Sequence, residues 1–174
     1  MMDKDFASEL AGIFNPPDIV RENMWREVGR AVVAISDIER VLAAICIRLS
    51  PASEREAVDI FMSDRMFASR LRFLTYLVAR WNDPKLSLRW ASIERKLQSH
   101  KRIRNLVAHQ GMIEGEPDNL GLPQVCLHPL SLKRGGKKLT AKDIKATADM
   151  LQKLKHDVGL MLISIKEPPA NRAR

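Results

Sequence analysis

The sequence has little that would cross-link the chain or attach it to a membrane. Cysteine occurs only twice in 174 residues, as Cys46 and Cys126, so no framework of disulfide bridges is predicted and a reducing, cytoplasmic location is the simpler interpretation. The first residues, MMDKDFASELAGIF, are acidic where a secretory signal would be positively charged, and no apolar run approaches the length of a membrane span. We therefore expect a soluble, cytoplasmic protein with no membrane partner.

Aromatic residues are also scarce. They make up 5% of the chain and include a single tyrosine, Tyr76, which argues against a surface that binds single strands by stacking bases on aromatic side chains. Positive charge is abundant, because 29 Lys and Arg against 21 Asp and Glu give a net charge of +8. Clustered cations displace counterions from phosphate backbones. The composition therefore indicates a nucleic-acid partner that is bound mainly through its phosphates.

The length fits one domain, and hydrophobic periodicity predicts its class. Apolar residues recur at steps of three and four along four stretches, the pattern of helices with one buried face. These stretches are 18–49, 53–81, 84–111 and 140–165. Four substantial helices predict an all-α fold, an up-and-down helical bundle over residues 1–167, with a disordered tail at 168–174.

Local signals mark where these helices begin and end. Two Ser or Thr residues are each followed three positions later by an acidic residue, as in the capping boxes that open helices: Ser53 with Glu56, and Thr140 with Asp143. The second stretch contains a candidate break near Ser63-Asp64, and Asn82-Asp83-Pro84 predicts a turn before the third helix. Gly111 suits a left-handed residue just past the end of that helix.

Between the last two helices the helical pattern is lost. Residues 111–138 are rich in Gly, Pro, Asp and Asn around short apolar runs, which predicts a small β-ribbon or an ordered loop. This segment contains a basic turn made of Lys133, Arg134, Lys137 and Lys138. These residues are candidates for phosphate binding, and a solvated hairpin tip explains them equally well.

The third helix ends in the segment of greatest chemical interest. It places Arg102, Arg104, Asn105 and His109 within about three turns. An imidazole can take the proton of a ribose 2′-hydroxyl or protonate the leaving oxygen, while a guanidinium holds the phosphate and offsets its growing charge. These are the groups needed to cleave RNA without a metal ion.

Spacing alone is weak evidence for such a site. With 17 Arg and 4 His in the chain, roughly one Arg-x4–6-His match is expected by chance, and Arg95 to His100 is such a match within a helical stretch. The segment from Arg104 to His109 differs in its context. An Asn follows the Arg, a small Ala precedes the His, and a Gly lies two residues beyond it.

This context resembles the HEPN family, whose members share a short helical bundle and an Arg-x4–6-His motif near the end of a late helix. The motif here is Arg104-Asn105-Leu106-Val107-Ala108-His109. The resemblance is sharp over about ten residues and otherwise rests on helix order. It implies a metal-independent endoribonuclease that acts as a homodimer, with Arg104 and His109 catalytic and Asn105 orienting them. It also implies RNA as substrate, no cofactor, and an antitoxin or other regulatory protein as partner, in a bacterial stress, toxin–antitoxin or phage-defence system. Family toxins paired with nucleotidyltransferase antitoxins often have a Tyr where this chain has Gly111.

Ideal helical geometry complicates this assignment. Residues five apart lie about 140° apart around a helix axis, so Arg104 and His109 cannot share one face, whereas Arg102 and His109 can. Arg102 is therefore a second candidate for phosphate contact. In a dimer, Arg104 of one chain would serve His109 of the other.

Other roles for these residues stay open. Glu39 could support the motif by reaching one of its arginines, or could be an exposed helical residue near Arg40. His109 could cap a helix end while Arg104 forms a surface ion pair. The remaining histidines have no partners at ligand spacing, so no metal site is predicted. The alternative function is a non-catalytic HEPN-like module that binds nucleic acid or a partner protein.

Overall fold

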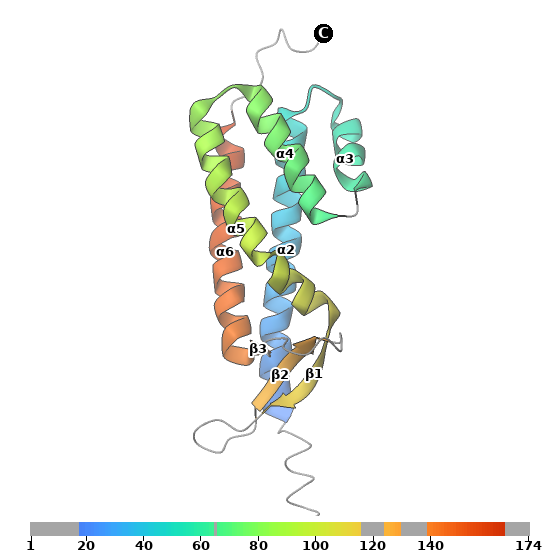
Figure 1. The fold of residues 1–174 in the computed structure, drawn as a ribbon, viewed down its shortest axis with the longest axis vertical. Helices are drawn as coiled ribbons and strands as arrows, with labels where there is room; N and C mark the ends of the chain where they lie inside the picture. The colour runs from blue at the N-terminus through green and yellow to red at the C-terminus, as the bar shows by residue number, and fades with distance from the viewer. Residues whose placement is uncertain (1–17, 65, 116–123, 130–138, 166–174) are drawn as a thin grey trace, which may run out of the picture. The chain divides into compact units, whose positions relative to one another are not determined.

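The computed structural model describes residues 18–64, 66–115, 124–129 and 139–165, and for 18–19, 100–115, 124–125 and 127–129 it describes the backbone alone. Five helices account for most of these residues (Figure 1): α2 Asp18–Leu49, α3 Glu54–Ser63, α4 Phe67–Trp81, α5 Pro84–His109 and α6 Ala141–Ser164. Three short strands lie between α5 and α6: β1 Gln110–Gly115, β2 Gln124–Pro129 and β3 Leu139–Thr140. The all-α helical fold is confirmed, with a small insertion between the last two helices as predicted.

Both predicted capping boxes are present. At the start of α3 the Ser53 amide donates to the Glu56 carboxylate at 3.0 Å, and the Glu56 amide donates back to the Ser53 hydroxyl at 3.4 Å. Before α6 the Thr140 amide donates to the Asp143 carboxylate at 3.0 Å, and the Asp143 amide donates to the Thr140 hydroxyl at 3.2 Å. These bonds satisfy amide groups that have no carbonyl partner at a helix start, so they fix where each helix begins.

The stretch from 53 to 81 forms two helices, because the candidate break at Ser63-Asp64 is real. Asp64 has extended backbone angles and its carboxylate accepts from the Met66 amide at 2.8 Å. At the far end of α4, Asn82 adopts the left-handed conformation with φ 56°. Asp83 then accepts from the amides of Lys85 and Leu86 at 2.8 and 3.2 Å, which opens α5 directly after the turn.

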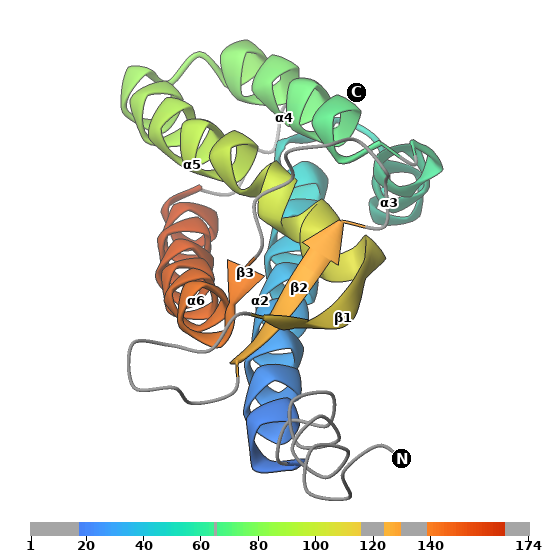
Figure 2. The ribbon, with the colours of Figure 1, turned by 60° about the horizontal axis from the view of Figure 1, so that its bottom comes forward.

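The strands form an antiparallel sheet in the order β1-β2-β3 (Figure 2). Gly111 pairs with His128 between β1 and β2, and Cys126 pairs with Thr140 between β2 and β3. The predicted ribbon is therefore present, with a two-residue third strand that leads straight into α6.

The backbone divides into two compact units, each described by itself below. The motif unit comprises Met1–Val33 and Arg102–Met150, and the hairpin unit comprises Ala34–Lys101 and Leu151–Arg174. The expected single domain of residues 1–167 would contain both units, and it stays a prediction. The predicted tail at 168–174 lies outside the described residues.

The motif unit has a small apolar core between the first part of α2, β3 and the first part of α6. Met24 and Val28 of α2 are buried against Leu139 of β3 and Ile144 of α6. Arg30 reinforces this contact, since its guanidinium pairs at 2.7 Å with Asp149 of α6 and at 2.7 Å with Glu27 on its own helix.

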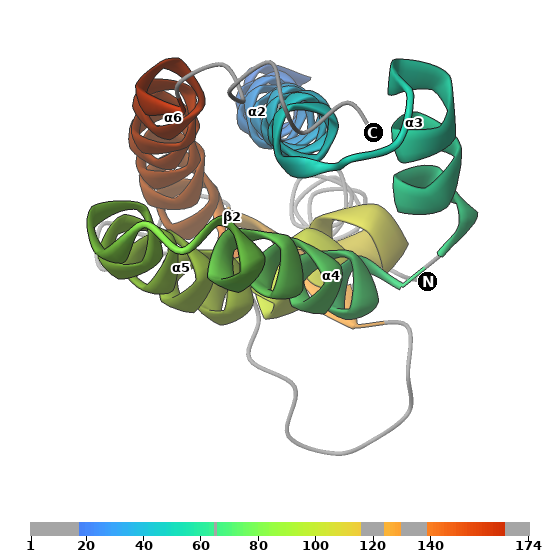
Figure 3. The ribbon, with the colours of Figure 1, turned by 90° about the horizontal axis from the view of Figure 1, so that it is seen from above.

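The hairpin unit contains the larger core. Its buried apolar residues come from all five helices and include Leu42, Ile45, Phe61, Leu71, Leu74, Trp90, Leu154, Val158 and Met161. Helices α4 and α5 form an antiparallel helical hairpin (Figure 3). The Trp90 indole N–H of α5 donates to the Thr75 hydroxyl of α4 at 2.8 Å, which fixes the two helices at that level.

Candidate active site at the end of α5

The candidate catalytic residues lie in the last two turns of α5. The helix continues without a break through Arg102, Arg104 and Asn105 and ends at His109. Gly111 lies outside the helix, as predicted, but it is the second residue of strand β1, which begins at Gln110 directly after His109. The backbone of Gly111 pairs with His128 of β2, so the sheet rather than a left-handed glycine ends the helix.

The helical backbone decides which motif positions share a face. At 100° per residue, positions 102 and 109 differ by about 20° and positions 105 and 109 by about 40°, so these three lie on one side of α5. Positions 104 and 109 differ by about 140°. Helix α5 shows no loosening that would reduce this angle. Within one chain the helix therefore groups Arg102 and Asn105 with His109, and sets Arg104 apart.

The sheet ties the end of α5 to the rest of the motif unit. β1 follows His109 directly and pairs along its whole length with β2, from Gln110 opposite Pro129 to Gly115 opposite Gln124. β2 in turn pairs with β3, whose Leu139 lies in the unit's core. A chain of backbone pairing thus leads from the motif to the capped start of α6, which positions the helix end on an ordered scaffold.

Glu39, the predicted supporting residue, lies in the hairpin unit rather than in the motif unit. Its carboxylate forms an ion pair with Arg70 of α4 at 3.8 Å, and both side chains are largely buried. The Arg70 guanidinium also lies 5.6 Å from the centre of the Phe61 ring, and it donates to the Asp64 carbonyl at 2.7 Å. These contacts assign Glu39 a packing role between α2 and α4. Its supporting role at the motif stays a prediction.

The basic turn that was predicted to bind phosphate lies outside the described residues. It comprises Lys133, Arg134, Lys137 and Lys138. Within the part of the chain that the structure describes, no group of three or more His, Cys, Asp or Glu side chains is arranged to hold a metal ion. None of the helices described combines the length and the apolar character that crossing a bilayer requires.

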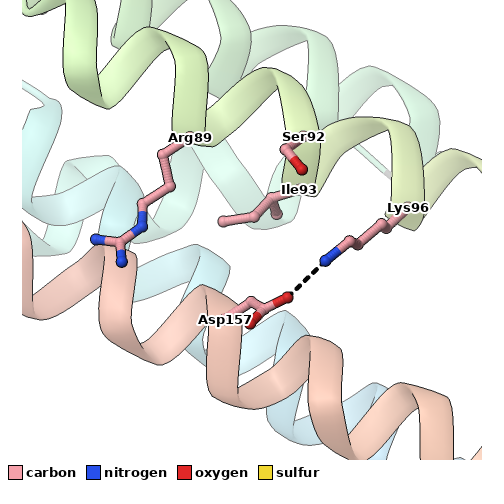
Figure 4. A pocket seen from close by; sticks show the side chains of 5 residues that line it. All are labelled: Arg89, Ser92, Ile93, Lys96 and Asp157. Atoms are coloured by element: carbon pink, nitrogen blue, oxygen red, sulfur yellow. Dashed lines mark hydrogen bonds and ion pairs between the residues drawn. The ribbon is translucent and has the colours of Figure 1, made fainter.

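One cavity of about 180 Å³ lies between α5 and α6 of the hairpin unit (Figure 4). It is lined by Arg89, Ser92, Ile93 and Lys96 of α5 and by Asp157 of α6. Lys96 is already neutralised there by Asp157 at 2.7 Å, as the figure shows. Ligand pockets usually occupy about 300 to 1,000 Å³, so this space is too small for a nucleotide. It is a structural groove and not a rival active site.

The one described thiol with a shifted pKa has no catalytic use. Cys46 is fully buried, and its thiol donates to the Ala57 carbonyl at 3.6 Å. Burial raises the pKa of this thiol to about 11, which disfavours the nucleophilic thiolate. Covalent chemistry on Cys46 is thereby disfavoured.

Comparisons with protein-family models, with curated proteins and with solved structures find no match to this chain. The chemistry of the residues at the end of α5 therefore carries the functional argument.

Sequence reasoning missed the concentration of charge in the helical hairpin. Residues 67–101 contain eight Lys and Arg but only two Asp and Glu, a net charge of +6 out of +8 for the whole chain. A count of charged residues along the sequence would have found this concentration. Its structural significance depends on the pairing of α4 with α5.

Proposed function

We propose that this protein is a cytoplasmic, metal-independent endoribonuclease of HEPN type, active as a homodimer, with His109 and Arg104 as catalytic residues. The observation that carries the proposal is the position of the motif at the end of α5, where His109 is the last helical residue. The negative end of a helix dipole stabilises the imidazolium form of histidine. A histidine at this place is therefore suited to take up a proton and to return one.

The reaction follows from these groups. The imidazole of His109 takes the proton of a ribose 2′-hydroxyl, whose oxygen attacks the adjacent phosphorus. The bond from phosphorus to the 5′-oxygen breaks, and that oxygen receives a proton from an imidazolium. The upstream product ends in a 2′,3′-cyclic phosphate and the downstream product in a 5′-hydroxyl. Guanidinium groups hold the phosphate and offset the charge of the transition state.

The helical geometry supports a site that is shared between two chains. Arg102 and Asn105 share one side of α5 with His109, and Arg104 lies about 140° from it. In a symmetric dimer, Arg104 of each chain reaches the phosphate held beside His109 of the other. Such an arrangement uses both residues without distorting the helix.

A subunit-mixing experiment tests this sharing. Arg104→Ala and His109→Ala proteins are each expected to be inactive, while the mixture regains about one quarter of wild-type activity, because half of the dimers then contain one intact shared site. Mixtures that stay inactive, although the subunits exchange, would contradict a shared site.

The direct test of the activity is cleavage of RNA in excess EDTA. Wild-type protein and a His156→Ala control, altered at an exposed histidine of α6, are expected to cut, and His109→Ala is expected not to. Intact RNA with all three proteins would refute the proposal.

A second function is favoured by the same helical geometry. If Arg104 and His109 never meet, the chain is a non-catalytic module that binds RNA or a regulatory protein such as an antitoxin. Intact RNA in the cleavage test, together with binding of RNA that weakens with salt, would support it. A setting in bacterial stress response or phage defence fits either function.

A further inference from the structure

The α4–α5 hairpin is strongly basic, and Tyr76 is the one aromatic residue among its described residues that is exposed. Residues 67–101 carry a net charge of +6, so a fifth of the chain holds three quarters of the net charge. Helix α4 contains three arginines and no acidic residue. Arg70 faces inward to Glu39, whereas Arg72, Tyr76 and Arg80 are exposed, Tyr76 by 58%.

These three residues follow one another at intervals of four. They therefore form a row along one side of α4, with steps of about 6 Å along the helix axis. The row presents cation, aromatic ring and cation in turn. The two guanidinium positions are therefore about 12 Å apart along the axis, with the ring between them, so they can contact two phosphates of one strand while a base lies against the ring.

Helix α5 adds exposed cations to the hairpin, among them Lys85 and Arg95. Each is five residues from Trp90, so it lies about 140° around α5 from the side that meets Thr75 of α4. These cations add to the positive charge of the hairpin, and the row itself is formed by α4.

Nothing acidic neutralises this face within the described part of the chain. No carboxylate pairs with the side chains of Arg72, Arg80 or Arg95 there, and the one bond of Arg72 is to the Ser69 hydroxyl at 3.1 Å. The hairpin's two carboxylates are used elsewhere. Asp83 caps α5, and Glu94 accepts from the Gln98 amide at 3.1 Å.

Several cations on other helices have structural roles instead. Arg30 and Arg40 of α2 and Lys155 of α6 are each held by carboxylates, so their charge serves to join helices or to stabilise them locally. The unpaired arginines of the hairpin contribute no such contact. Unpaired, exposed guanidinium groups at regular spacing are suited to binding a polyanion.

We infer that the side of α4 formed by Arg72, Tyr76 and Arg80 is a binding surface for single-stranded RNA, with Arg72 and Arg80 on phosphates and Tyr76 against a base. The inference deepens the proposed ribonuclease function, on which it rests for the choice of RNA as ligand. It assigns substrate binding to a surface made entirely of hairpin-unit residues, separate in sequence from Arg104 and His109.

The test measures binding without cleavage. A fluorescein-labelled, 2′-O-methyl RNA single strand lacks the attacking hydroxyl, so its anisotropy reports affinity whether or not the protein is a nuclease. The variant is Arg72→Gln/Arg80→Gln, because glutamine has a helix propensity close to that of arginine. The matched control is Arg55→Gln/Lys153→Gln, which removes the same charge at exposed positions of α3 and α6 that have no carboxylate partner among the described residues.

The hairpin variant is expected to bind about tenfold or more weakly at about 0.1 M salt, and its plot of log affinity against log salt to be shallower by about 1.4. The control variant is expected to change the affinity and the salt slope by much smaller amounts. Tyr76→Ala should weaken binding by about fivefold or more with an unchanged salt slope, since stacking releases no counterions.

Equal losses of RNA affinity in the variant and the control would overturn the inference, because they would show that binding depends on the net charge alone and not on this row of residues. No loss in the hairpin variant would overturn it as well. Binding to phosphatidylserine vesicles that depends on Arg72 and Arg80, without RNA binding, would assign the face to a lipid surface instead. Cleavage that needs His109 in a protein whose hairpin is dispensable would leave the proposed function intact, and hairpin-dependent binding without any cleavage would refute that function alone.

Discussion

The hydrogen bond between Trp90 and Thr75 should be worth a measurable part of the protein's stability. Trp90 is only 2% exposed, and its indole N–H donates to the Thr75 hydroxyl at 2.8 Å. The hydroxyl in turn donates to the Leu71 carbonyl at 3.0 Å. Thr75→Val keeps the shape of the side chain and nearly the same helix propensity, but leaves a buried donor without an acceptor. A group left unsatisfied in this way costs about 1 to 3 kcal/mol.

In a domain of this size each kcal/mol lowers the Tm by about 2 to 4 °C, so Thr75→Val should melt several degrees below wild type. Far-UV circular dichroism during thermal and urea unfolding measures the change. Thr75→Ser keeps the hydroxyl and serves as the control, with an expected loss of less than about 1 kcal/mol.

A double-mutant cycle separates the bond from other effects of the substitution. In a Trp90→Phe background the donor is absent, so Thr75→Val should then cost little, and the coupling free energy should be about 1 kcal/mol or more. A coupling near zero would refute the pairing of α4 with α5 at this level.

Three further results are expected. Cys46, with its pKa raised to about 11 by burial, should react with a thiol reagent only as fast as the protein unfolds, and rapid labelling of Cys46 in the native protein, located by mass spectrometry, would contradict its burial. The pKa of the Asp37 carboxyl is held below its usual range, first by its hydrogen bond from Lys155, so the stability that this pair contributes is present above the unfolded pKa of about 4 and is lost as the pH falls through the folded value. The gap in urea stability between wild type and Lys155→Met should therefore close on acidification, and a gap that stays constant to low pH would count against the ion pair. Thr140→Ala should cost about 1 kcal/mol by removing the cap of α6, with Thr140→Ser restoring it, and equal stabilities of the three proteins would show that the cap is not what fixes the start of the helix.

The parts of the fold that were predicted well depend on neighbours in the sequence. The bounds of α2 follow from an uninterrupted apolar periodicity and the Ser-Pro that ends it. The capping boxes at Ser53 and Thr140 are contacts over three residues, and a spacing rule is enough to find them. Asn82 takes up the left-handed conformation that the turn before Pro84 requires.

The parts that were missed depend on partners far along the chain. α5 ends at His109 because β2, about 20 residues later, pairs with Gln110 and Gly111. The two residues of β3 are too few to show any periodicity. The ion pair of Glu39 with Arg70 joins helices that no local pattern brings together.

The candidate site was predictable as a set of residues but not as an arrangement. The sequence identified Arg102, Arg104, Asn105 and His109 because their side chains match a chemistry, and the helix confirms that their positions are helical through His109. Which of them converge on a phosphate depends on a second copy of the chain. Spacing within one helix cannot settle that.

The proposed chemistry is tested most directly by the ends of the RNA fragments that the purified protein releases in excess EDTA. The proposal predicts 2′,3′-cyclic phosphates on upstream fragments and 5′-hydroxyls on downstream ones, produced by wild-type protein and by His156→Ala but not by His109→Ala. Fragments with 3′-hydroxyl and 5′-phosphate ends, loss of cleavage in EDTA, or unchanged cleavage by His109→Ala would each contradict it.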